Sequence, residues 1–172
     1  MITRRISEPS VELQRFLDES TLRGFDNNAT LDAMKWDWCL ENGGAWYATY
    51  RADDSIVSVS GIHPFSDGYR ALFRGAQLEP RPIGINKYHM QSHCFHSQLP
   101  LQIAFAKHYM PIYITTNVDN DASGMMTRIN RTFMLLETLG LVEHKELTKL
   151  GNTLQNVWQL DVEKYLSIRA KF

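Results

Sequence analysis

The sequence has few cysteines and no long apolar run. Cys39 and Cys94 are the only two cysteines in 172 residues, too few for a framework of disulfides, so we expect free thiols in a reducing compartment. No apolar run approaches the roughly 18 to 20 residues that a membrane-spanning helix needs, and the opening MITRRISEPS is too polar for a secretory signal. We therefore expect a cytoplasmic protein without a membrane partner.

An excess of positive charge is also missing. The chain has 18 Lys and Arg against 19 Asp and Glu, a net charge of -1. It therefore lacks the long-range positive field of a nucleic-acid-binding surface, and we expect no nucleic-acid partner. Internal repeats, low-complexity tracts and Pro/Gly/Ser linkers are absent as well. Because 172 residues with 44% apolar content suit one core, we expect a single domain over residues 1–172.

What the chain does contain is an ordered series of short elements. Alternating and β-branched stretches predict strands at 2–5, 45–51, 55–62, 69–80, 111–117, 141–148 and 153–162. Helical spacing and cap residues predict helices at 11–20, 31–42, 99–109, 125–140 and 162–168. Up to the last strand, the order is strand, two helices, three strands, helix, strand, helix and two strands. This order predicts an α/β or α+β fold with helices on both faces of one sheet.

Apolar spacing also predicts which side chains are buried. The helix at 125–140 should bury Met126, Ile129, Phe133, Leu136 and Leu139 or its neighbours, and Gly140 should cap it. Methionines at this spacing, Met134 among them, are typical core fillers.

Four aromatic residues form a second group, around the helix at 31–42 and the strand after it. They are Trp36, Trp38, Trp46 and Tyr47. Two interpretations stay open, because the group could be core packing or a wall that holds an amine or apolar substrate.

Two local stretches extend the argument. Residues 130–141, Asn-Arg-Thr-Phe-Met-Leu-Leu-Glu-Thr-Leu-Gly-Leu, resemble the Asn-led helix ending in Leu-Gly-aromatic of the GNAT superfamily of acyl-CoA-dependent N-acyltransferases. Residues 78–86, Leu-Glu-Pro-Arg-Pro-Ile-Gly-Ile-Asn, are similar to that family's Arg/Gln-x-x-Gly-x-Gly/Ala turn. Uncommitted amides at such a turn, at the start of a helix, favour the pyrophosphate of coenzyme A. The element order resembles the GNAT fold too: a mixed, mostly antiparallel sheet.

The resemblance implies a function and a set of residues. The reaction would be transfer of an acetyl or other acyl group from the cosubstrate acyl-CoA to a small-molecule or peptide amine. The resemblance leaves open whether the protein forms a homodimer. The cofactor-binding candidates are Gln77, Leu78, Arg81, Gly84, Ile85, Asn86 and Asn117. Glu79 and His63 are the candidates for the catalytic base near the point where the fourth and fifth strands diverge.

The chain departs from the family pattern in two places. Asn86 stands where a second small residue is expected, and Leu136 stands where the family commonly has a tyrosine that protonates the leaving thiolate. A leucine cannot donate a proton. A second hypothesis is therefore a GNAT-like binding or assembly module without catalysis.

A third hypothesis is a metal-dependent hydrolase. His89, His93 and His96 would share one helical face and could present three imidazoles to a metal, although we assign no metal ligands. Cys94 beside them is either an activated nucleophile or a buried, inert thiol, and we favour the second interpretation.

Overall fold

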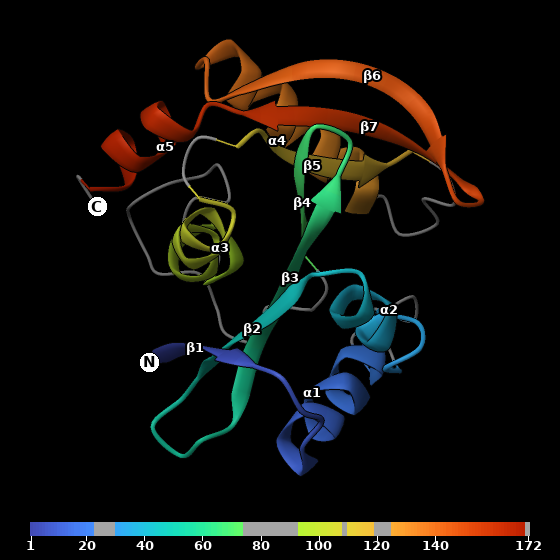
Figure 1. Cartoon of the computed structure of the whole chain (residues 1–172), viewed down its shortest axis with the longest axis vertical. Helices are drawn as coiled ribbons and strands as arrows, with labels where there is room; N and C mark the ends of the chain where they lie inside the picture. The colour runs from blue at the N-terminus through green and yellow to red at the C-terminus, as the bar shows by residue number, and fades with distance from the viewer. Residues whose placement is uncertain (23–29, 74–92, 108–109, 119–124, 171–172) are drawn as a thin grey trace.

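The computed structural model describes residues 1–22, 30–73, 93–107, 110–118 and 125–170, which form a seven-stranded sheet and its helices (Figure 1). The strands are β1 (Ile2–Ile6), β2 (Ala45–Tyr50), β3 (Ile56–Phe65), β4 (Gly68–Phe73), β5 (Ile112–Asn117), β6 (Val142–Leu150) and β7 (Thr153–Leu160). The α-helices are α1 (Val11–Leu22), α2 (Trp36–Glu41), α3 (Leu99–Phe105), α4 (Met125–Thr138) and α5 (Val162–Arg169), and a π-helical turn, η2 (Cys94–Gln98), runs directly into α3.

The sheet is mostly antiparallel. Its strand order is β1-β2-β3-β4-β5-β7-β6, and only the central pair, β4 and β5, is parallel. The mixed fold and the expected order of elements are confirmed. A parallel pair needs a crossover between its strands, and η2 with α3 lies on that crossover between β4 and β5.

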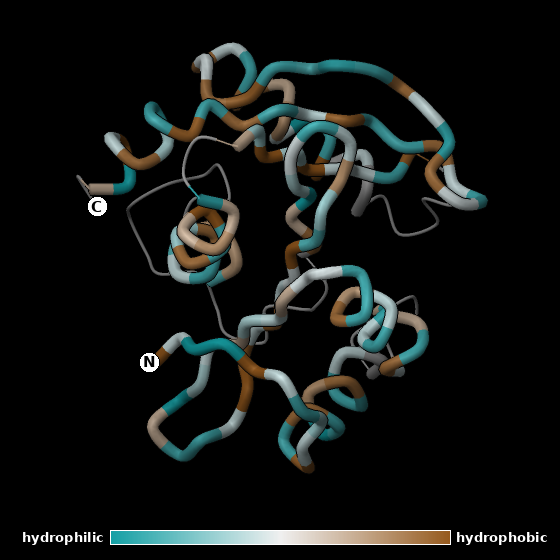
Figure 2. The backbone as a smooth tube through the Cα atoms, in the orientation of Figure 1, coloured by the Kyte–Doolittle hydropathy of each residue, from teal (hydrophilic) through white to brown (hydrophobic). Residues whose placement is uncertain are grey.

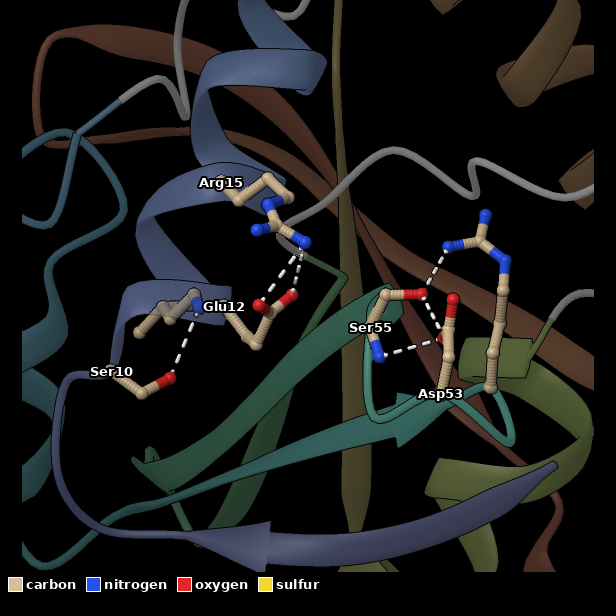
Figure 3. Close-up of polar contacts among 7 residues, drawn as sticks. Ser10, Glu12, Arg15, Asp53 and Ser55 are labelled. Carbon is tan, nitrogen blue, oxygen red and sulfur yellow. Dashed lines mark hydrogen bonds and ion pairs between the residues drawn. The ribbon is translucent and has the colours of Figure 1, made fainter.

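Short polar residues define the local starts and turns, as Figure 3 shows. Ser10 Oγ accepts a hydrogen bond from Leu13 N at 3.1 Å and caps the start of α1. In the β2–β3 turn, Asp53 Oδ1 accepts from Ser55 N at 3.1 Å and from Ser55 Oγ at 2.7 Å. These contacts confirm the helix start at Pro9-Ser10 and the turn at 52–54.

Each face of the sheet covers its own hydrophobic core, and Figure 1 shows α3 on one side of β2 and β3, with α1 and α2 on the other. We call the side covered by α3, α4 and α5 the α4 face; its core includes Ile62, Ile114, Leu136 and Trp158. We call the opposite side the α1 face; its core is built mainly from α1, α2 and the facing residues of β2 and β3. Helices on both faces of one sheet are therefore confirmed.

The structure differs from the sequence predictions in two helices. The helix predicted at 31–42 begins only at Trp36, because Lys35 takes the left-handed conformation with φ 60° and breaks the helical path. In that helix Trp36 and Cys39 are buried, whereas Trp38 is 44% exposed. The spacing of apolar residues predicts which side chains share one face of a helix. It does not determine how a six-residue helix is rotated about its axis relative to the sheet.

Helix α4 also differs from its predicted stripe. Phe133 and Leu136 are buried as expected, but Met134 is 60% and Leu139 45% exposed. Met134 is therefore not core filler, because it lies on the outer side of the helix. Gly140 does follow the helix with φ 73°, a conformation typical of a helix C-terminus. The side chains of Met125 and Met126 lie outside the described residues.

The helical segment around Pro100 starts earlier than predicted, and a π-bulge explains how. Leu99 N bonds to Cys94 O, five residues back, and Pro100 has no N–H to give to His96 O. Helix α5 supplies donors to this turn, since Tyr165 Oη donates to Phe95 O and Arg169 Nε donates to His96 O at 2.8 Å. The C-terminal helix is thus bonded to the π-bulge.

Strand β6 forms one edge of the sheet and is mostly hydrophilic, as the teal stretches of Figure 2 show. Five consecutive residues, 143–147, are exposed, and three of them are charged. Charged side chains on an edge strand disfavour pairing with another chain. Of the helices in the described ranges, none combines the length and the apolar character needed to cross a membrane.

Candidate active site

The central feature is a gap that opens between β4 and β5. The two strands pair only at Tyr69–Ala71 with Ile112–Ile114. Beyond Ala71, β4 stays with β3 through Phe73, while β5 continues to Asn117 alongside β7. Two parallel strands thus diverge at their carboxyl ends in the middle of the sheet.

Backbone groups face this gap. Tyr69 N donates to Pro111 O at 2.9 Å, so the N–H and C=O of Tyr69 point towards β5. These groups alternate sides along a strand, so the N–H and C=O of Phe73 point the same way, past the last paired residue. An extended arm with amide groups, such as the pantetheine of coenzyme A, fits that edge because it can pair as a further strand would.

A polar network holds the end of β5 from the α4 face. Asn130 of α4 donates from Nδ2 to Asn117 O at 2.8 Å, and its Oδ1 accepts from Thr116 Oγ1 at 2.6 Å and from Asn156 Nδ2 at 2.9 Å. Trp158 Nε1 donates to Thr116 Oγ1 at 2.9 Å. Asn117 was a candidate for cofactor binding; its carbonyl is taken up by Asn130, and its role with a cofactor stays a prediction.

His63 lies inside β3 on the α1 face, opposite Arg70 of β4. It is a strand residue and not part of a loop before Pro64, because β3 continues through Pro64 to Phe65. His63 is 3% exposed, and its Nδ1 lies 2.7 Å from Pro64 O. A carbonyl oxygen only accepts, so Nδ1 carries a proton; in the neutral form of the ring the lone pair is then on Nε2.

Aromatic rings line the α1 face around His63. Its ring meets Trp38 edge-on with centroids 4.7 Å apart and Phe65 at 6.4 Å, and Phe65 meets Tyr113 at 5.7 Å. The aromatic group predicted from sequence divides in two. Trp36 and Trp46 stack in the core at 5.4 Å and Tyr47 belongs to the other face, whereas Trp38 is the exposed ring beside His63.

Two side chains, Leu136 and Tyr113, are relevant to the question of which group could protonate the leaving thiolate. Leu136 is fully buried in the core of the α4 face, and its side chain has no proton to donate. Tyr113 Oη donates to Asp67 Oδ1 at 2.6 Å, at the turn between β3 and β4. This hydrogen bond, with burial, raises the pKa of Tyr113 to about 12. Tyr113 is therefore directed away from the gap and holds its proton firmly.

Most of the cofactor candidates lie outside the described residues. This applies to Gln77, Leu78, Arg81, Gly84, Ile85 and Asn86, and to the second base candidate, Glu79. They stay predictions. Sequence reasoning missed the described residues Phe65, Tyr113 and Asn156, because each has a partner far away in the sequence: Phe65 contacts Tyr113, Tyr113 bonds to Asp67, and Asn156 bonds to Asn130.

The histidine cluster is only partly described, because His89 lies outside the described ranges. Within them, no group of three His, Cys, Asp or Glu side chains could hold a metal ion. Cys94 is 7% exposed, with Ser58 Oγ 2.9 Å from its sulfur, and burial raises the pKa of its thiol to about 11. A thiol with such a pKa is protonated near neutral pH, which supports a buried, inert cysteine.

Comparison with known proteins supports the fold assignment. No protein-family model matches the chain, and no curated protein matches its sequence. Among solved structures, it is similar to an aminoglycoside 6'-N-acetyltransferase complexed with coenzyme A, at 13% identity over 92% of this chain and 95% of that one, with a TM-score of 0.55.

Two further structures agree. One is an acetyltransferase of the GNAT family from Staphylococcus aureus Mu50, at 13% identity over 91% and 98% of the two chains, TM-score 0.53. The other is a spermidine N-acetyltransferase chimera from Vibrio cholerae and hSSAT, at 12% identity over 97% and 99%, TM-score 0.52. The architecture is thus that of a mixed α+β sheet with a central divergence of strands. It is the GNAT fold, in a divergent sequence.

Proposed function

We propose that the protein is an N-acyltransferase that transfers an acetyl or other acyl group from acyl-CoA to an amine. The observation that carries this proposal is the gap between β4 and β5, with backbone groups of Phe73 facing it, within a GNAT-fold sheet. The similar solved structures support it, because one holds coenzyme A and others are acetyltransferases of aminoglycosides and spermidine.

In this proposal the pantetheine arm pairs with the edge of β4 at Phe73, and bound acyl-CoA supplies the thioester carbonyl that the amine attacks. Gln77, Leu78, Arg81, Gly84, Ile85 and Asn86 follow β4 in the chain and would hold the rest of the coenzyme. An amine attacks only as the free base, so a base must accept the proton of its ammonium form.

We assign this role to His63. In its neutral form, with the proton on Nδ1, the basic lone pair would be on Nε2, and the residue lies on the strand next to β4. Glu79 follows β4 and is the alternative base. The exposed ring of Trp38 beside His63 would contact the acceptor, since an aromatic face suits both apolar groups and amines.

The first test is binding. We expect acetyl-CoA to produce calorimetric heat and to raise the melting temperature of the pure protein. Activity would then be followed as free thiol released from acetyl-CoA in the presence of a panel of small amines and peptides. Absence of both heat and thermal shift would refute the proposal.

The second test concerns the base. His63→Gln should reduce kcat by roughly 100- to 10,000-fold, the range of general base catalysis, with the affinity for acetyl-CoA unchanged. Trp38→Ala should instead raise KM for the amine. Unchanged kcat in the His63 variant would transfer the role to Glu79, to be tested as Glu79→Gln.

A further inference from the structure

The side chain of Arg70 crosses from β4 to two other strands on the α1 face. Its Nε donates to Thr115 Oγ1 of β5 at 2.8 Å, and its Nη2 donates to Gln155 Oε1 of β7 at 3.1 Å. Gln155 Nε2 in turn donates to Thr153 Oγ1 at 2.8 Å, which orients the Gln155 carbonyl towards Arg70. One guanidinium therefore joins β4, β5 and β7.

The position of this link coincides with the start of the gap. Arg70 lies in the three-residue ladder of β4 and β5, and Thr115 is the first residue of β5 beyond that ladder. Gln155 pairs with Asn117, the last residue of β5. The link thus spans the stretch of β5 that leaves β4 and continues alongside β7.

A second link holds the same stretch from the opposite face. There Asn130 bonds to Thr116 and Asn117 and accepts from Asn156 of β7. Side chains alternate along a strand, so Thr115 is held on one face and Thr116 on the other. The end of β5 is thus held from both faces, through Arg70 of β4 on the α1 face and through Asn130 of α4 on the other, which fixes its position relative to β4 and β7.

The chemistry of the link requires arginine. A guanidinium presents several N–H donors in one rigid plane, so it can bond to two acceptors on different strands at once. The ring of Phe65 packs against it, with Cζ of Arg70 5.9 Å from the ring centroid. A lysine keeps the charge but offers a single nitrogen, which cannot reproduce two donors at separate positions.

We propose that Arg70 is a positioning residue that fixes where the gap between β4 and β5 begins, by bonding β4 to Thr115 of β5 and to Gln155 of β7 at the end of the ladder. It acts through the strands and not by contact with the reacting atoms. The consequence for the acyl-CoA arm rests on the proposed function, whereas the effect on β5 itself does not.

The test compares Arg70→Lys with the wild-type chain in two measurements. In the free protein, backbone hydrogen exchange over 112–117 should become at least about threefold faster, because β5 loses its link on the α1 face. Calorimetry should show acetyl-CoA binding about tenfold weaker, and KM for acetyl-CoA should rise by a similar factor with kcat changed less than about threefold.

Matched variants separate this from general destabilisation. Arg51→Lys replaces another hydrogen-bonded arginine, whose Nη1 donates to Ser55 Oγ at 2.8 Å in the β2–β3 turn, and should leave both measurements unchanged. Thr115→Val removes the hydroxyl acceptor and should reproduce the effect in part, whereas Thr115→Ser should restore wild-type values.

The outcomes distinguish the two proposals. Unchanged exchange over 112–117 in Arg70→Lys would overturn the inference, whatever the protein binds. Faster exchange in a protein whose wild-type form does not bind acetyl-CoA would support the link and refute the proposed function. Faster exchange with unchanged acetyl-CoA affinity would refute the positioning role, because the gap would not depend on Arg70.

Discussion

Replacement of Tyr165 by phenylalanine tests how firmly the C-terminal helix is attached to the π-bulge. Tyr165 is fully buried, and its hydroxyl donates to the carbonyl of Phe95 in η2. Phenylalanine preserves the ring and its edge-on contact with Phe95, at 5.7 Å between centroids. The substitution therefore removes one hydrogen bond and little packing.

The expected cost is large for a single atom. Removing one partner of a buried hydrogen bond costs about 1 to 3 kcal/mol, and we expect Tyr165→Phe to lower the free energy of unfolding by about 2 kcal/mol. For a protein of this size each kcal/mol shifts the melting temperature by about 2 to 4 °C, so a fall of about 4 to 8 °C should follow. Urea unfolding and calorimetry would measure both values.

Tyr113→Phe is the matched control, because it removes the same atom in a different setting. The hydroxyl of Tyr113 bonds to Asp67, whose exposed carboxylate can bond to water instead. We expect a loss of at most about 1 kcal/mol. Equal losses in the two variants, or a Tyr165→Phe protein as stable as the wild type, would refute the account of the π-bulge.

Three other predictions concern stability and reactivity. Gly68→Ala should lower the free energy of unfolding, measured in urea titrations, by more than about 3 kcal/mol. The reason is that the added Cβ would lie 2.1 Å from the backbone carbonyl oxygen of Pro111. A loss of less than about 1 kcal/mol would contradict this packing. Both Cys39 and Cys94 are buried, and the pKa of Cys94 is raised to about 11. A disulfide reagent at pH 8 should therefore react with no thiol in the native protein and with two in denaturant. Rapid reaction of the native protein would contradict this prediction. Burial raises the pKa of Tyr165, and the hydrogen bond to Asp67 raises the pKa of Tyr113. The tyrosines of the unfolded chain therefore lose their protons at a lower pH than these two do in the folded protein. The free energy of unfolding should fall as pH rises above about 10, and it should fall less steeply in Tyr165→Phe.

Local chemistry in the sequence predicted much of the fold. Ser10 starts α1, Gly140 ends α4, and the turn at 52–54 joins two strands, because caps and turns depend on residues within three or four positions. Alternation and helical spacing predicted the order of the elements for the same reason. The sequence also predicted that His63 lies near the end of a strand, and its role as a base stays a prediction.

Burial and contacts between distant segments depended on the tertiary structure. The exposure of Trp38 and Met134 depends on how each helix is rotated on the sheet, and that rotation is set by the opposing strands. The early start of the helical segment before Pro100 depends on donors from α5, 70 or more residues away. No local pattern contains that information.

For the candidate site, too, some features followed from the sequence and others depended on the tertiary structure. The sequence by itself determined the class of fold, because strands and helices follow from the spacing of apolar residues along the chain. Only the tertiary structure decided that β5 leaves β4 after three pairs and that Arg70 reaches residues 45 and 85 positions away. Strand pairing brings together side chains whose distance in the sequence carries no signal, and the gap between β4 and β5 is a product of that pairing.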